Sequence, residues 1–172
     1  PQDILLSQFD SEQRLQTLQK QIGVIEQYHE FFLQHNVAVI LSVDEEMAAT
    51  ILSSEFLLRK LRPLQALELA INENFPDFSA GNNNPILSDL SASFKLTLNN
   101  FGSGRAPAKA VYDNLFQRIR LDKYFLHQTL KRASFPAMLK AIVHQGSDHC
   151  QQFIATGVDD PAMLDSIAPF AF

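Results

Sequence analysis

The sequence predicts an α/β fold in which helices cover a parallel β-sheet. Short β-rich runs alternate with helical patterns along the chain, and most of these runs lack strict polar/apolar alternation. The 172 residues are enough for one domain with a sizeable core. Two architectures fit this pattern, a doubly wound sheet and a (β/α)8 barrel.

Five segments have the length and composition of strands. The segment "SAGNNNP" (79–85), which lies between two of them, reads as a surface loop because asparagine, glycine and proline favour turns. No internal repeat is evident. The predicted strands are 37–43, 66–72, 95–100, 116–122 and 151–158.

Helical patterns fill the intervals between these strands. Residues 11–34 carry apolar side chains on one helical face, and a second helix begins at Asp44. Asn84 and Asp160 each precede a proline, which is typical of an N-cap followed by the first helical residue. Further helices are predicted over 106–115, 123–132 and 135–145, the last two separated near Pro136.

Composition and charge exclude several classes of function. The net charge of −5 and the pI of about 5.5 argue against direct binding to nucleic acid. No apolar run approaches the roughly 20 residues of a membrane span, and no signal peptide is recognisable. The single cysteine, Cys150, cannot form an internal disulfide. We therefore expect a cytoplasmic protein.

Polar side chains follow each predicted strand. Because the carboxyl ends of parallel strands meet at one edge, we expect a single polar patch, where α/β proteins place their function. No phosphate-binding glycine loop follows the first strand, which argues against a nucleotide-binding doubly wound fold. The strand-end residues are Ser42 and Asp44, Asn72 and Glu73, Asn99 and Asn100, Asp122 and Lys123, and Thr156 and Asp159.

Five collinear segments at these strand ends resemble the EAL-domain family of cyclic-di-GMP phosphodiesterases. "LSVDEEM" resembles the family's Ser-Val-Asn-Leu-Ser, and "LELAINEN" resembles Leu-Glu-Leu-Glu-x-Thr-Glu-Ser. "LTLNNFGSGRAP" resembles Leu-Asp-Asp-Phe-Gly-Thr-Gly, "IRLDKYF" resembles Leu-Lys-Ile-Asp-x-x-Phe, and "IATGVDD" resembles Ala-Glu-Gly-Val-Glu-Thr. The resemblance implies an EAL-like modified (β/α)8 TIM-type barrel. We expect residues 1–172 to form a single EAL-like domain truncated at both ends, with the first-strand glutamate segment and the last strand outside the chain.

The resemblance also implies that the catalytic equipment is largely lost. The family holds two divalent cations with carboxylates, and neutral amides replace such anionic ligands poorly. We therefore expect no catalytic residue, no bound metal, no cofactor and no phosphodiesterase activity. The degenerate positions are Ala70, Asn99, Asn100 and Thr156 in place of carboxylates, Arg120 in place of lysine, Asp44 in place of asparagine, and the matching Glu73 and Asp122.

Among degenerate members, the chain is most similar to enterobacterial regulators that bind FlhD, a subunit of the flagellar activator FlhD/FlhC. The segments that carry this similarity are 68–77, 109–128, 134–142 and 167–172. The resemblance implies a partner protein that is kept off DNA, so that flagellar genes and motility are repressed, without direct contact to nucleic acid or membrane. The sequence does not indicate which surface would contact FlhD.

Two alternative functions stay open. One is a non-catalytic receptor in which Arg105 and Arg120 contact the phosphates of cyclic-di-GMP, although the altered site residues argue against this ligand. The chain could also retain weak phosphodiesterase activity, which would require Asp44 and Glu73 to rebuild a metal site with a glutamate that precedes Pro1.

Several local features also have structural explanations. Adjacent asparagines at a strand end can simply form a turn, and Arg120 can form an ion pair with Asp122. His29 lies on the apolar face of the first helix, where a histidine with satisfied hydrogen bonds is the usual interpretation. A solvated helix end explains three possible metal ligands close in sequence, His144, His149 and Cys150, because their spacing matches no standard zinc pattern.

Overall fold

The computed structural model describes residues 10–102 and 108–170. Within these residues, five parallel strands form one sheet, with neighbours in the order β1-β2-β3-β4-β5. A doubly wound sheet reverses its strand order at a switch point, whereas each strand of a (β/α)8 barrel lies beside the next one in sequence. The sheet therefore has the winding of a barrel segment. The strands are β1 (Val39–Val43), β2 (Leu67–Asn72), β3 (Lys95–Phe101), β4 (Arg118–Leu121) and β5 (Gln152–Ala155).

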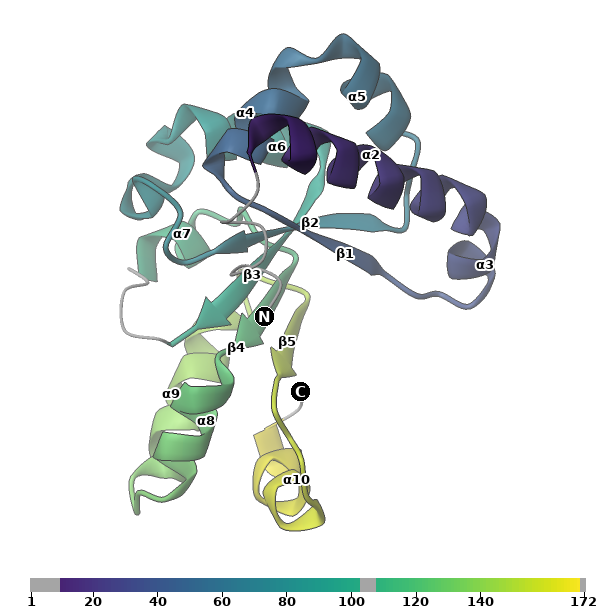
Figure 1. The fold of residues 1–172 in the computed structure, drawn as a ribbon. Coiled ribbons are helices and arrows are strands. Elements are labelled where there is room, and N and C mark those ends of the chain that lie inside the picture. The colour runs from purple at the N-terminus through teal and green to yellow at the C-terminus, as the bar shows by residue number, and fades with distance from the viewer. Residues whose placement is uncertain (1–9, 103–107, 171–172) are drawn as a thin grey trace.

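Each strand lies inside or within one residue of its predicted segment, and helices connect the strands. Figure 1 shows α2, α4, α5 and α6 gathered beside one part of the sheet, with α8, α9 and α10 at the other end. The helices are α2 (Ser11–Gln27), α3 (His29–Gln34), α4 (Glu45–Ser53), α5 (Glu55–Leu61), α6 (Pro85–Ser93), α7 (Ala108–Tyr112), α8 (Lys123–Leu130), α9 (Phe135–Gly146) and α10 (Pro161–Ile167), with the 3₁₀ helices η1 (Phe78–Asn83) and η2 (Ala168–Phe170).

The predicted helix over 11–34 is wrong in its continuity, because it breaks at Tyr28. Tyr28 has φ −107° and ψ 13°, which ends α2 and begins α3. Only α2 carries a buried stripe, made by Leu18, Ile22 and Ile25, whereas α3 has no buried residue. The predicted helix is therefore continuous only over the part whose apolar side chains pack in the core.

The helix predicted to begin at Asp44 is confirmed as α4, which Asp44 caps; it ends at Ser53, and Ser54 caps a separate helix, α5. Two other helix predictions shift in the structure. The break near Pro136 precedes this proline, which lies in the first turn of α9. Of the helix predicted over 106–115, the structure describes α7, while residues 106 and 107 lie outside the described part. Asn84 and Asp160 cap α6 and α10 as predicted.

The segment "SAGNNNP" is not an irregular loop, because most of it lies in η1. Gly81 is buried there with φ 57°, a left-handed conformation that glycine adopts without strain. The side chain of Asn84 accepts hydrogen bonds from the backbone N–H groups of Ile86 and Leu87. The segment from η1 to Asn84 therefore fixes the position at which α6 begins.

The strands of the sheet have one apolar and one polar face. Leu69, Leu98 and Ile119 lie on the apolar face and are fully buried in the core under the helices. Alternate residues lie on the other face, where Asn99 and Arg120 are half-buried. The strands were expected to lack strict polar/apolar alternation, but in the structure only one of their two faces joins the apolar core. The polar face positions the candidate site.

An ion pair at the amino-terminal part of this polar face joins an almost fully buried carboxylate to an arginine whose side chain is 25% exposed. Glu68, only 3% exposed, accepts a hydrogen bond from the Thr97 hydroxyl over 2.7 Å and pairs with the Arg118 guanidinium. Arg118 also donates to the side-chain oxygen of Gln152 over 3.1 Å. Side chains from four neighbouring strands are therefore joined across the sheet.

None of the helices in residues 10–102 and 108–170 has the length and apolar character that a membrane-spanning helix requires.

The Glu68–Arg118 pair predicts a stability effect. Replacing Arg118→Ala leaves the Glu68 carboxylate buried without its cation, which should lower the free energy of unfolding by about 3–5 kcal/mol. The paired substitution Glu68→Gln with Arg118→Met should cost clearly less, because no charge stays buried. Urea unfolding followed by circular dichroism measures both.

The matched control is Arg59→Ala, which removes an exposed pair with Glu55 four residues earlier in α5. Exposed pairs of this kind contribute about 0.3–0.5 kcal/mol, so this variant should unfold almost as the wild type does. Equal stability of the Arg118→Ala and Arg59→Ala variants would show that the buried pair does not stabilise the sheet.

Candidate functional site

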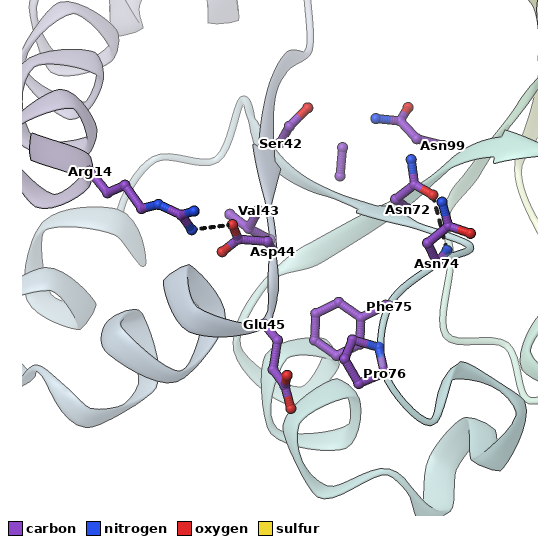
Figure 2. Close-up of a pocket in the computed structure, with 11 residues that line it drawn as sticks. Arg14, Ser42, Val43, Asp44, Glu45, Asn72, Asn74, Phe75, Pro76 and Asn99 are labelled. Carbon is purple, nitrogen blue, oxygen red and sulfur yellow. Dashed lines mark hydrogen bonds and ion pairs between the residues drawn. The ribbon is translucent and has the colours of Figure 1, made fainter. Parts of the chain in front are cut away.

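The carboxyl ends of β1, β2 and β3 border a cavity of about 310 Å³. The register places Ser42 beside Ala70 and Asn72 beside Asn99, so side chains of three adjacent strands meet there. Figure 2 shows these side chains around the cavity. The residues that line it are Arg14, Ser42, Val43, Asp44, Glu45, Ala70, Asn72, Asn74, Phe75, Pro76 and Asn99.

The Asp44 carboxylate, at the end of β1, is already used in two structural interactions. One oxygen accepts the backbone N–H of Met47 over 2.9 Å and thereby caps α4. The other pairs with the Arg14 guanidinium over 2.7 Å, and Arg14 also contacts Glu46 over 3.2 Å (Figure 2 shows the Asp44 contact). A metal ion at this carboxylate would compete with a guanidinium that is covalently part of the protein.

The side-chain oxygens of two cavity asparagines are both occupied by donors. The Asn72 oxygen accepts the backbone N–H of Asn74 over 3.0 Å. The Asn99 oxygen accepts a hydrogen bond from the Arg120 guanidinium over 3.0 Å. These bonds fix the orientation of both amides, so each NH₂ group is directed elsewhere.

The alternative that Arg120 forms an ion pair with Asp122 is wrong. Asp122 instead accepts the backbone N–H of Phe125 over 2.8 Å and caps α8. Arg120 takes Asn99 as its side-chain partner among the described residues. The arginine therefore bonds to a neutral amide at the position where the family resemblance places an aspartate.

The remaining predicted positions have different surroundings. Ala70 is 1% exposed and leaves open the space that a longer side chain would fill. Glu73 is 3% exposed, directly after β2. The Thr156 hydroxyl donates to the backbone carbonyl of Leu121 over 2.6 Å, which ties β5 to β4. Asn100 is exposed and has φ 59°, a left-handed conformation that asparagine tolerates.

The structure thus brings together only part of the predicted set. Asp44, Ala70 and Asn99 line the cavity, and Arg120 joins them through Asn99. The two adjacent asparagines have different surroundings. Asn99 lines the cavity, whereas Asn100 lies within β3 with a positive φ, at the place where the register between β3 and β4 shifts. The structural explanation of the pair as a simple turn is therefore wrong, because both residues belong to the strand. The other predicted positions, Glu73, Asn100, Asp122 and Thr156, do not line the cavity.

Sequence reasoning missed several residues of the cavity wall. Arg14 lies on α2, 30 residues before Asp44, and no local pattern predicts that the two side chains meet. Asn74, Phe75 and Pro76 follow β2 directly, so their position after a predicted strand was a usable signal. Arg105, a candidate phosphate ligand, lies outside the described residues.

The histidine and cysteine candidates do not form a metal centre in the described residues. No group of three or more His, Cys, Asp or Glu side chains there could hold a metal ion. His149 contacts the Asn114 side-chain oxygen over 2.9 Å, and burial raises the pKa of the Cys150 thiol. His29 departs from prediction, since its buried Nδ1 has no hydrogen-bond partner in the described part of the chain.

A family model described as "EAL domain" matches residues 2–170 of the chain. A protein named "Anti-FlhC(2)FlhD(4) factor YdiV" from Salmonella choleraesuis (strain SC-B67) is 34% identical over 172 residues, which are 100% of this chain and 73% of that protein. A protein from Escherichia coli (strain K12) named "Putative anti-FlhC(2)FlhD(4) factor YdiV" has the same identity and coverage.

Solved structures agree with these matches. The structure described as "Crystal structure of EAL-like domain protein YdiV" is 34% identical with a TM-score of 0.91, covering 100% of this chain and 73% of that one. The FimX EAL domain is 16% identical with a TM-score of 0.70, covering 99% of this chain and 71% of its own, and shares the fold alone. Because the family model spans nearly all 172 residues and the Salmonella relative is similar throughout, the chain belongs to the EAL-domain family.

Proposed function

We propose that this protein is a non-catalytic EAL-domain regulator that binds the FlhD subunit of FlhD/FlhC. By preventing the activator from binding DNA, it represses flagellar genes and motility. The observation that carries the proposal is similarity over the entire chain to proteins named as anti-FlhC(2)FlhD(4) factors, with a TM-score of 0.91 to a solved EAL-like YdiV domain.

The chemistry of the cavity supports a non-catalytic role. A two-metal phosphodiesterase needs several carboxylates that are free to bind cations. Here Asp44 caps a helix and pairs with Arg14, and Asp122 caps another helix. Alanine, asparagine and threonine stand at the positions where the resemblance implies further acids. Too few anionic ligands are available to hold two dications close together.

The charge of the cavity gives less support to a cyclic-di-GMP receptor. Its lining contains one cation, Arg14, and two carboxylates, Asp44 and Glu45, which leave a net charge of −1. Both phosphates of cyclic-di-GMP are anionic, so the lining does not compensate their charge. Arg120 lies behind Asn99 and is engaged by its amide. Protein binding therefore fits the site better than nucleotide binding.

The proposed function also bears on the cellular location of the protein and on the extent of its domain. We infer that residues 1–172 belong to a single EAL-like domain and that the protein acts in the cytoplasm, where a bacterial transcription activator works. A chain with a net charge of −5 is suited to bind a basic, DNA-binding protein rather than DNA itself.

One prediction of the proposed function concerns complex formation. The purified protein at micromolar concentration should co-elute with Salmonella FlhD, and with assembled FlhD/FlhC, from a sizing column. In a gel-shift assay, it should also reduce the binding of FlhD/FlhC to promoter DNA as its concentration rises. Clean separation of the proteins on the column, with no effect on the gel shift, would refute the proposed function.

Another prediction of the proposed function concerns catalysis. The protein should show no hydrolysis of cyclic-di-GMP above the blank with Mg²⁺ or Mn²⁺, because the cavity lacks a carboxylate cage. Product formation is measured by chromatography beside an active EAL phosphodiesterase as positive control. Turnover that rises with protein concentration and disappears with EDTA would contradict the non-catalytic assignment and favour residual phosphodiesterase activity.

A further inference from the structure

The cavity contains hydrogen-bond donors without partners among the described residues. The side-chain oxygens of Asn72 and Asn99 are occupied, but neither NH₂ group has a hydrogen-bond acceptor there. In Figure 2 the Asn72 nitrogen points toward Asn99, and the Asn99 nitrogen points across the cavity toward Ser42. The Ser42 hydroxyl also has no partner in the described part of the chain. Three adjacent strands thus present donors to the same space.

These donors suit an oxygen acceptor that carries no full charge. The amide of Asn99 receives a hydrogen bond from Arg120, which polarises it and strengthens its own N–H groups as donors. Amide NH₂ groups pair well with the carbonyl oxygens of a polypeptide backbone. The net charge of −1 on the lining disfavours an anionic ligand. A backbone carbonyl therefore fits this end of the cavity.

The opposite end of the cavity is suited to a cation. The Glu45 carboxylate is exposed and makes no hydrogen bond or ion pair with any other described residue. Figure 2 shows Phe75 and Pro76 between Glu45 and the side chains of Asn72 and Asn99. A group that reaches from the amides to Glu45 must therefore pass an apolar wall. Lysine and arginine match this arrangement, because their methylene stems can pack against the apolar wall while their cationic ends reach the Glu45 carboxylate.

We propose that the cavity holds a lysine or arginine of a protein partner, with its backbone carbonyls on Asn72 and Asn99 and its cation at Glu45. A volume of about 310 Å³ is at the lower end of the range for pockets that enclose a small molecule, about 300–1,000 Å³, and suits one side chain of a larger partner. This inference rests on the proposed function, because it names the surface that would take a basic residue of the activator.

Charge complementarity connects this surface to repression. Proteins that bind DNA present lysine and arginine to its phosphates. When such a residue enters the cavity of this acidic protein, it is no longer available to DNA. Binding of the regulator and binding of DNA are then mutually exclusive, and both weaken as salt rises.

The test compares matched variants in binding to immobilised Salmonella FlhD/FlhC. Glu45→Gln removes the proposed carboxylate, and we expect binding about 3–10-fold weaker, with a smaller dependence on salt. Asn72→Leu replaces the amide donor with an apolar side chain of similar size and should weaken binding by at least about threefold. Glu55→Gln is the control, since Glu55 is likewise the first residue of a helix but does not line the cavity. It should bind as the wild type does.

The outcomes separate the two proposals. If the wild type binds FlhD/FlhC and all three variants bind equally well, the cavity inference is wrong while the proposed function stands. If the wild type does not bind, the proposed function fails. Melting curves by circular dichroism establish that each variant is folded, and Glu45→Gln, which changes an exposed side chain, keeps the test valid if Asn72→Leu unfolds.

A second measurement does not depend on FlhD/FlhC. N-acetyl-L-arginine amide carries two carbonyl acceptors and a guanidinium, whereas N-acetyl-L-leucine amide lacks the cation. Titrated into the labelled wild-type protein, the arginine compound should shift the side-chain amide NMR signals of Asn72 and Asn99 saturably, in the millimolar range. The leucine compound, and the Glu45→Gln variant, should show much smaller shifts. Identical responses to both compounds would overturn the proposal.

Discussion

The alternation of side chains along the parallel strands is the constraint on which the rest of the structure depends. One face of β2, β3 and β4 is made of leucine and isoleucine that helices bury completely. Because successive residues point to opposite faces, the other face receives Glu68, Thr97, Asn99, Arg118 and Arg120. A shift of one residue in register would place Glu68 and Arg118 in the apolar core. The fold and the polar site are therefore fixed by the same pairing.

Three arginine side chains occupy acceptor groups on the polar face of the sheet and beside it. Arg14 pairs with Asp44, and Arg120 bonds to Asn99, while Arg118 pairs with Glu68 deeper in the same face. Each guanidinium satisfies an acceptor without the cost of recruiting an ion from solution. In the non-catalytic role proposed above, these polar groups form a hydrogen-bonded surface rather than a set of unpaired charges. A degenerate site of this kind can persist because its polar groups stabilise the sheet.

The strands and the helix caps were predictable from sequence because their signals are local. All five strands and the caps at Asp44, Asn84 and Asp160 follow from residues that are neighbours in the chain. The break at Tyr28 was not predictable, since it depends on where the core stops supporting the helix. The bond from Arg120 to Asn99 joins two strands and needs their register. The sequence identified both residues as site positions but could not pair them.

The neutral groups on which the proposed non-catalytic role rests also suit the protein partner proposed for the cavity. A carboxylate at position 99 would pair with Arg120 and offer only acceptors, whereas the asparagine accepts from Arg120 and still donates toward the cavity. A longer side chain at position 70 would fill space that Ala70 leaves open. Asn99 and Ala70 thus provide a donor and open volume at positions where the family resemblance places acids. In this way the strand ends of a phosphodiesterase fold can become a surface that recognises polypeptide.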